Sequence, residues 1–113
     1  MHEMSICESI VQTMESLART RGFHRVDAVW LEIGPLAGVE LDALRFGFDV
    51  VTRGTLADGA RLEVVQPEAS AWCVDCMRTV PIQTRFDPCP DCGRYGLLVT
   101  SGDQMRIKEL EVI

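Results

Sequence analysis

The sequence predicts a small α+β protein in which two helices pack with a three-stranded sheet and a metal-binding module is inserted before the last strand. Two segments have apolar residues at helical spacing, short runs rich in β-branched residues lie between and after them, and a late stretch replaces this pattern with four grouped cysteines. With 47% hydrophobic residues among 113, the chain has material for one modest core. We expect a main domain from residues 1–67 plus 104–113, and a module from residues 68–103.

The first predicted helix runs from Glu3 to about Arg21 and ends at Gly22. Its apolar positions recur at helical spacing: Ile6, Ile10, Met14 and Leu17. Cys7 lies on this stripe, so we interpret it as a small buried residue without a ligand role. His24 follows the helix end, where it interacts most simply with the last carbonyls or with solvent.

Strands and a second helix follow in order. The β-branched run from Val26 to Ile33 predicts a strand, which Gly34-Pro35 ends. Apolar residues spaced from Leu41 to Val51 predict the second helix. Further strands are expected at about Arg61 to Gln66 and from Gln104 to Ile113, so the last strand completes a sheet begun before the module.

The module contains two Cys-X-X-Cys pairs separated by twelve residues. The ligands would be four thiolates: Cys73, Cys76, Cys89 and Cys92. A closed shell of four thiolates suits structural zinc, and Gly93 permits the left-handed backbone that such a knuckle needs. A rubredoxin-type iron centre is the alternative ion. Asp75 and Asp91, inside the pairs, are interpreted as solvated turn residues.

The N-terminal tripeptide Met1-His2-Glu3 presents a second set of metal donors. The Met1 amine, the His2 amide and the His2 imidazole form adjacent chelate rings, and the Glu3 amide can supply a fourth nitrogen. Four nitrogens in one plane are typical of Ni(II) or Cu(II) sites. The bulky His2 should also preserve the initiator methionine. A second-position histidine is otherwise an exposed residue of a frayed terminus, so this pattern alone is weak.

Charge and composition exclude several classes of function. Seventeen acidic against eleven basic residues give a formal charge of −6, which argues against a nucleic-acid partner. No segment has the run of apolar residues of a signal peptide or membrane helix, so we expect a cytoplasmic protein with reduced cysteines. The sequence also lacks a phosphate-binding glycine loop, a serine nucleophile elbow and a His-Glu-X-X-His helix, so no enzymatic activity is expected.

These features together resemble the HypA/HybF family of hydrogenase maturation factors, which are nickel metallochaperones. The resemblance covers the whole chain and rests on these segments: Met1-His2-Glu3-Met4-Ser5, Glu32-Ile33-Gly34, Leu44 to Gly54, both cysteine pairs, and Ile107-Lys108-Glu109-Leu110. It implies a nickel-binding main domain, with Ni(II) on His2 and on backbone nitrogens of His2 and Glu3, together with the Met1 amine. It also implies structural Zn(II) on the four cysteines, which makes the module a zinc ribbon.

The resemblance further implies partners: a HypB-type GTPase and the large-subunit precursor of [NiFe]-hydrogenase, with urease served by some relatives. A further nickel ligand is expected at Glu40, which is equally interpreted as an exposed carboxylate at a helix N-terminus. Two alternatives stay open at this stage. One is a zinc-ribbon interaction module with an incidental His2, and the other is a rubredoxin-like electron carrier. A monomer and a homodimer are both compatible with the sequence.

Overall fold

A computed structural model describes residues 2–113, which form two compact units. The first, here called the helical unit, contains the residues up to Leu31 together with Val39–Val64 and Ile107–Ile113. The second, here called the cysteine unit, contains Glu32–Gly38 and Val65–Arg106. Each unit has its own sheet.

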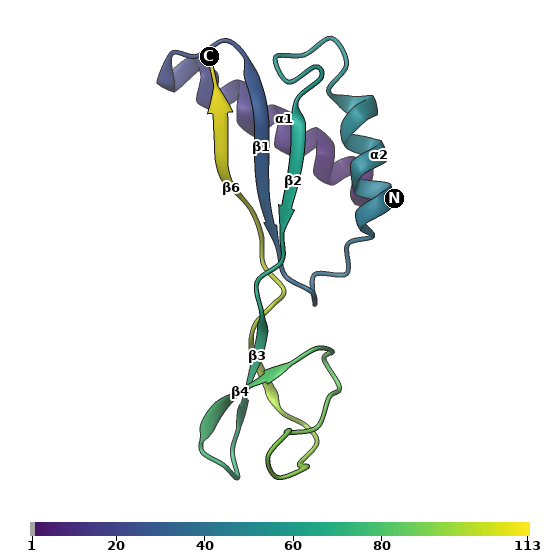
Figure 1. Cartoon of the computed structure of the whole chain (residues 1–113), viewed down its shortest axis with the longest axis vertical. Coiled ribbons are helices and arrows are strands. Elements are labelled where there is room, and N and C mark those ends of the chain that lie inside the picture. Colours follow the sequence, from purple (N-terminus) through teal and green to yellow (C-terminus); the bar gives the residue numbers. More distant parts are fainter. Residues whose placement is uncertain (1) are drawn as a thin grey trace. The chain divides into compact units, whose positions relative to one another are not determined.

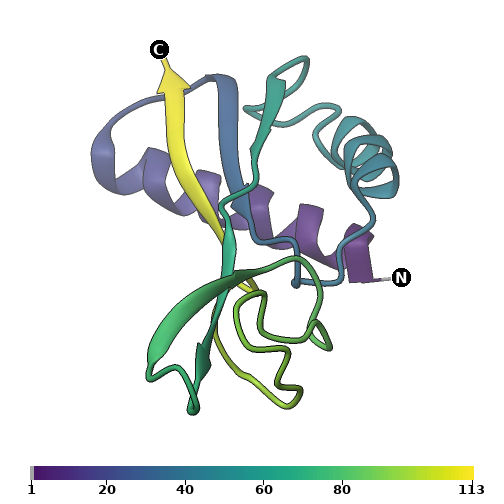
Figure 2. The same ribbon diagram turned by 60° about the horizontal axis from the view of Figure 1, so that its bottom comes forward.

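The helical unit pairs two helices with a three-stranded sheet, which confirms the predicted α+β class (Figure 1). Its helices are α1 (His2–Arg21) and α2 (Leu41–Val51). Its strands are β1 (Val26–Ile33), β2 (Arg61–Val65) and β6 (Met105–Val112), in the order β2-β1-β6. Both views show the helices on one side of this sheet (Figure 2). β1 is the central strand, and its less buried positions are Asp27, Trp30 and Glu32, whereas the other five residues are buried.

The core of the helical unit lies between the helices and β1. Within the helical unit, the buried side chains of these three elements include Cys7, Ile10, Val11, Met14, Leu44, Phe48, Val29 and Leu31. Each large apolar side chain buried in this way stabilises the fold by about 1.5–3 kcal/mol. The two helices approach closely where Cys7 meets Gly47, because a Cβ on Gly47 would lie 3.3 Å from the Cys7 Sγ.

Cys7 is fully buried, as its place on the apolar stripe predicts. Its thiol donates to the Leu44 carbonyl at 3.4 Å, and burial raises the pKa of this thiol to about 11. Cys7 is therefore a neutral core residue.

The cysteine unit contains a second antiparallel sheet that the sequence analysis did not predict. Its strands are β3 (Ala69–Cys73), β4 (Arg78–Ile82) and β5 (Leu98–Ser101), in the order β4-β3-β5. One face buries a small cluster of Ala69, Ala71 and Ile82, against which three partly buried residues pack: Leu36, Leu97 and Val99. The unit therefore has an apolar core, although a small one.

Two glycines bring backbone segments of the cysteine unit into direct contact. Gly34 N donates to Gln104 O at 2.8 Å, and Leu36 N donates to Gly102 O at 2.7 Å. A Cβ on Gly34 would lie 2.0 Å from Gly102 O, which leaves no space for a side chain. The segment after β1 is thus fastened to the chain that leads into β6.

Within residues 2–113, neither helix combines the length and the apolarity that crossing a membrane requires.

Candidate metal centre

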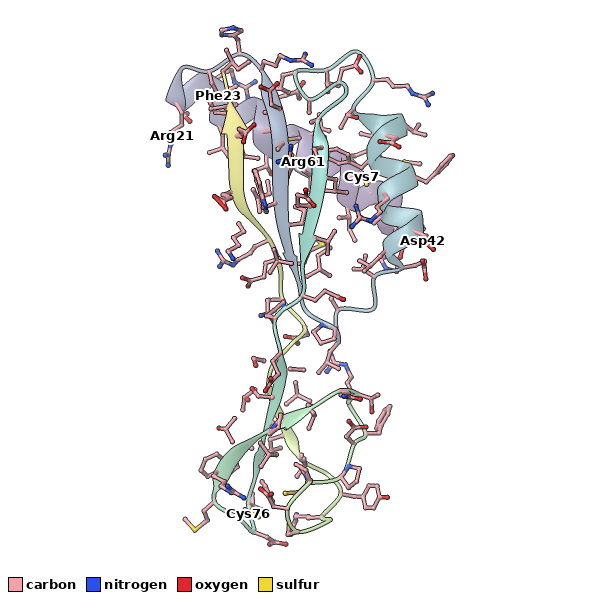
Figure 3. The ribbon with its side chains drawn as sticks, in the orientation of Figure 1. Cys7, Arg21, Phe23, Asp42, Arg61 and Cys76 are labelled. Atoms are coloured by element: carbon pink, nitrogen blue, oxygen red, sulfur yellow. The ribbon has the colours of Figure 1, made fainter. Side chains whose placement is uncertain are left out.

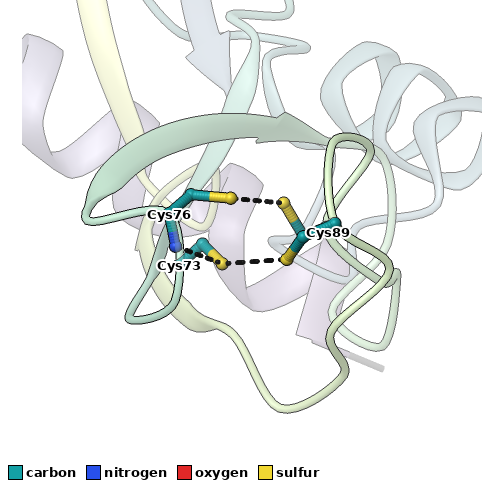
Figure 4. A group of neighbouring side chains, drawn as sticks. Cys73, Cys76 and Cys89 are labelled. Atoms are coloured by element: carbon teal, nitrogen blue, oxygen red, sulfur yellow. Dashed lines mark hydrogen bonds between the residues drawn. The ribbon is translucent and has the colours of Figure 1, made fainter.

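The two Cys-X-X-Cys pairs converge at one end of the cysteine unit (Figure 4). Their four Sγ atoms all lie within 4.8 Å of one another. Cys73 ends β3 and Cys76 lies in the turn to β4, whereas Cys89 and Cys92 lie in the loop between β4 and β5. The structure therefore brings together all four cysteines that the spacing singled out.

Each pair is closed by a residue with left-handed backbone conformation. Gly93 follows the second pair with φ 77°, as predicted, and its amide donates to Cys89 O at 2.9 Å. Met77 occupies the matching position after the first pair with φ 52°. A left-handed methionine is strained, so the turn around Cys73 and Cys76 imposes this conformation.

The sulfur separations fit a tetrahedral metal site. Cys73 Sγ lies 3.6 Å from Cys92 Sγ, and Cys76 Sγ lies 3.8 Å from Cys89 Sγ. A tetrahedron of sulfurs about 2.3 Å from a zinc ion has edges of about 3.8 Å. A disulfide would instead require a separation of about 2.05 Å, and all four cysteines are free thiols. The donor set and its spacing are consistent with structural zinc.

Backbone amides support the sulfurs. Cys76 N donates to Cys73 Sγ at 3.5 Å, and Asp91 N donates to Cys89 Sγ at 3.4 Å. The backbone N–H of Cys92, with that of Asp91, lowers the pKa of Cys89 to about 7. In contrast, hydrogen bonding to the Cys92 side chain, with burial, raises the pKa of Cys76 to about 12. Without a cation, such crowded thiols do not ionise together.

Two ion pairs connect the cysteine pairs to each other. Arg94, which follows the second cysteine pair, lies 3.0 Å from Asp75 inside the first pair. Arg78, which follows the first pair, forms an ion pair with Asp91 inside the second. Both aspartates are exposed, as expected for turn residues, but they are paired rather than simply solvated. Sequence reasoning missed the two arginines and Met77; the only local signal was that each follows a cysteine pair by one or two residues.

Of the predicted N-terminal donors, His2 and Glu3 lie in the helical unit, at the start of α1. His2 is largely exposed, and its Nε2 is 3.0 Å from Glu3 Oε2. The same Glu3 oxygen accepts from Glu40 N at 3.2 Å, which joins the first turn of α1 to the start of α2. That backbone N–H lowers the pKa of Glu3. The expected role of the Met1 amine lies outside the described residues.

Glu40 is the N-cap of α2. Its extended backbone precedes the helix, and its Oε1 accepts from Asp42 N at 2.9 Å. His24, the other histidine, is exposed beyond the end of α1, where its amide donates to Ile113 O at 3.1 Å. The structure thus brings Glu40 near Glu3 and leaves His24 apart from the N-terminal donors.

The fold and these sites define a two-unit metal-binding protein, in which a zinc-ribbon-like cysteine unit accompanies an α+β helical unit. The profile described as "Hydrogenase/urease nickel incorporation, metallochaperone, hypA" matches residues 1–112. The chain therefore belongs to the HypA family of nickel metallochaperones that act in hydrogenase maturation.

Named relatives agree along the whole chain. The hydrogenase maturation factor HypA of Azotobacter chroococcum mcd 1 is 60% identical over 112 residues, with 99% of each chain covered. The protein of the same name from Alkalilimnicola ehrlichii is 61% identical over 112 residues, again with 99% of each covered. Among solved structures, the nickel metallochaperone HypA of Helicobacter pylori shares the fold with a TM-score of 0.71 at 22% identity, over 98% of this chain and 97% of that one.

Proposed function

We propose that this protein binds Ni(II) at its N-terminus and delivers it to the large-subunit precursor of [NiFe]-hydrogenase, without catalysing a reaction. The ligands would be the His2 imidazole, the backbone nitrogens of His2 and Glu3, and the Met1 amine. The observation that carries the proposal is the placement of Glu3, whose carboxylate contacts His2 Nε2 and accepts from Glu40 N. A carboxylate that contacts the far nitrogen of a ligating imidazole fixes the orientation of the ring, and Glu3 is positioned to do this for His2.

The local backbone suits this chemistry. The first N–H groups of a helix have no intrahelical partner, so amide nitrogens at the start of α1 can be deprotonated without breaking the helix. An imidazole that closes a chelate ring with its own amide uses Nδ1, while Glu3 engages Nε2. Glu40 remains a candidate for a further ligand, and recruiting its side chain would release the cap on Asp42 N.

In this proposal the four cysteines hold structural zinc. The four-thiolate shell leaves no open position for a substrate, so the metal would order the cysteine unit rather than react. The same separations suit iron, so metal analysis is the direct test against a rubredoxin-like centre. The cytoplasm is the compartment proposed, because thiols stay reduced there and remain able to bind a metal.

The proposed partners are a HypB-type GTPase as nickel source and the hydrogenase precursor as recipient. A carrier must release its metal as well as bind it. A terminal site with few covering side chains permits an acceptor's ligands to replace its own one at a time.

Nickel titration of the zinc-loaded protein tests the proposal, with His24→Ala as the matched control for His2→Ala. The chain has only these two histidines, and both are exposed. We expect His2→Ala to abolish tight stoichiometric binding, while His24→Ala binds like the unaltered protein. Equal affinity in both variants would refute the N-terminal site.

X-ray absorption tests whether the Met1 amine is a nickel ligand. A few residues placed before Met1 remove this amine, so the nickel spectrum should change from planar nitrogen coordination to a more oxygen-rich environment. Identical spectra with and without the extension would exclude the amine as a ligand.

A further inference from the structure

The sequence around the four cysteines repeats a six-residue pattern. Residues 73–78 read Cys-Val-Asp-Cys-Met-Arg, and residues 89–94 read Cys-Pro-Asp-Cys-Gly-Arg. Both segments, here called the first and the second knuckle, therefore have the form Cys-X-Asp-Cys-X-Arg. A metal ion held by four thiolates explains the cysteines of this pattern. It does not require an aspartate and an arginine at matching positions of both knuckles.

The charged residues of the pattern join one knuckle to the other. Arg94 Nη1, in the second knuckle, lies 3.0 Å from Asp75 Oδ1 in the first. Arg78 Nη2, in the first knuckle, forms an ion pair with Asp91 Oδ2 in the second. Each arginine is thus paired with the aspartate of the opposite knuckle. We call these two contacts the crossed pairs.

The backbone fixes the first knuckle more firmly than the second. The first closes the hairpin of β3 and β4, and Cys76 lies in its turn (Figure 3). The second lies within residues 83–97, which form neither helix nor strand. Its bond from Gly93 N to Cys89 O shapes the second knuckle without joining it to the first. The position of the second knuckle therefore depends more on the metal and on the crossed pairs.

The crossed pairs oppose the movement that would release a metal. A closed shell of four thiolates has no open position, so a thiolate must leave before the ion can, and this requires the knuckles to move apart. The four charged side chains are between 43% and 58% exposed. One ion pair at such exposure changes an equilibrium constant by at most about fivefold. Two pairs between the same two knuckles act together, because both must separate.

We propose that Arg78 and Arg94 are positioning residues of the metal site, which hold the knuckles together through the crossed pairs and slow the release of zinc. They do not bind the metal, because a guanidinium group is cationic and has only donors. This inference rests on the proposed zinc site and is independent of nickel binding at the N-terminus.

The test measures how fast the full zinc-loaded chain loses zinc to an excess of a coloured chelator at low ionic strength. Arg94→Met removes the charge but keeps an unbranched apolar side chain, so zinc should leave about three- to fivefold faster. Arg94→Lys keeps the charge and should stay closer to the unaltered rate. Arg85→Met is the matched control, because Arg85 forms an exposed ion pair with Asp103 at 3.6 Å, in the same unit but outside the knuckles. Its zinc should leave at the unaltered rate.

A charge swap separates ion pairing from any other role of Arg94. Arg94→Asp alone brings two carboxylates together and should speed zinc loss about tenfold, since a repulsion replaces an attraction. Adding Asp75→Arg forms the pair again in the opposite direction, so the rate should return to within about threefold of the unaltered value. Salt at about 1 M should speed zinc loss from the unaltered chain, but should have little effect when Arg78→Met and Arg94→Met are combined.

Metal analysis of the unaltered chain separates this inference from the zinc site on which it rests. A chain purified without zinc would overturn both. With zinc present, the inference alone is overturned if Arg78→Met and Arg94→Met each lose zinc at the unaltered rate. It is also overturned if Arg85→Met speeds the loss equally, or if the charge swap does not restore the rate. Should Arg94→Asp fail to retain zinc during purification, the comparison of Arg94→Met with Arg94→Lys gives the decision.

Discussion

A single carboxylate oxygen of Glu3 connects the starts of the two helices. It lies 3.0 Å from His2 Nε2 and accepts from Glu40 N at 3.2 Å. The two donors beside this oxygen favour the ionised form of the Glu3 carboxyl group. The contact with Nε2 also limits the positions of the His2 ring. The Glu3 side chain therefore positions His2. The backbone nitrogen of Glu3 is, separately, one of the proposed nickel ligands.

This contact makes the ionisation of Glu3 dependent on the fold. Because the Glu40 N–H lowers the pKa of Glu3, the contact stabilises the native state above the ordinary value of 4.5, and this stability is lost as the pH falls through the lower native pKa. NMR titration of the Glu3 carboxyl carbon should give a midpoint below 4.5. The midpoint should stay low in His2→Ala, since the Glu40 amide is the main cause and His2 a minor one. A midpoint at or above 4.5 would contradict the contact.

The proposed N-terminal nickel donors are adjacent in the chain, so the sequence alone could suggest them, and their role stays a prediction. Amine, amide and imidazole belong to successive residues, so their chelate rings need no tertiary structure. The partner of the Glu3 side chain lies 37 residues away, and nothing in the sequence near Glu3 indicates it. Glu40 was predicted both as a nickel ligand and as a helix-terminal carboxylate; the structure places it as the N-cap of α2, and its role toward nickel stays a prediction.

Among the elements, the cysteine unit differs most from expectation. Its strands were missed because β3 is built from Ala, Ser, Trp and Cys, and β4 contains Pro81. A proline is tolerated there because β4 is an edge strand, where no further strand needs its missing N–H. The four cysteines themselves were predictable, since their spacing alone determines that both pairs can meet around one ion.

The turns after the two cysteine pairs should respond oppositely to similar substitutions. Gly93→Ala puts a Cβ on a left-handed residue and should cost about 1 kcal/mol, although open space surrounds the position. Met77→Gly removes such strain and should stabilise the zinc-loaded protein by about 0.5–1 kcal/mol, after the entropy cost of glycine is subtracted. Denaturant unfolding measures both, with Met77→Ala as the control that keeps the strain. Shifts of the same sign in Gly93→Ala and Met77→Gly would show that backbone conformation is not the cause.

The backbone crossing at Gly34 should tolerate no side chain. A Cβ would lie 2.0 Å from Gly102 O, and a backbone atom cannot move aside as a flexible side chain can. Gly34→Ala should therefore cost about 3 kcal/mol or more, at the upper end of overpacking effects. Gly38→Ala is the control. The φ of Gly38 is +72°, but a Cβ added there would have no atom within 4 Å apart from its chain neighbours, so only the smaller conformational cost applies. Thermal unfolding should rank the two in this order, and equal losses would contradict the close approach.

For the whole molecule, the two units are stabilised by different means. The helical unit buries large side chains between two helices and a sheet. In the cysteine unit, by contrast, one of the core clusters consists of Cys73, Val80 and Cys89, so two of its three buried members are candidate metal ligands. Sequence composition indicated this difference, because the module is poor in regularly spaced apolar residues, but it did not reveal the small second cluster around Ala71.

Removing zinc should therefore unfold the cysteine unit and spare α1. Metal binding contributes about 10–16 kcal/mol to structural zinc sites, far more than a cluster of a few small residues can replace. After chelation, or in Cys73→Ser, hydrogen exchange with mass spectrometry should show loss of amide protection in β3, β4 and β5, while the buried turns of α1 keep theirs. Cys7→Ser is the matched control, because this fifth cysteine lies outside the cluster and a serine hydroxyl can still donate to Leu44 O. That variant should retain one equivalent of zinc. Full protection of β3 after chelation, or loss of zinc from Cys7→Ser, would show that the four-thiolate cluster does not hold the unit together.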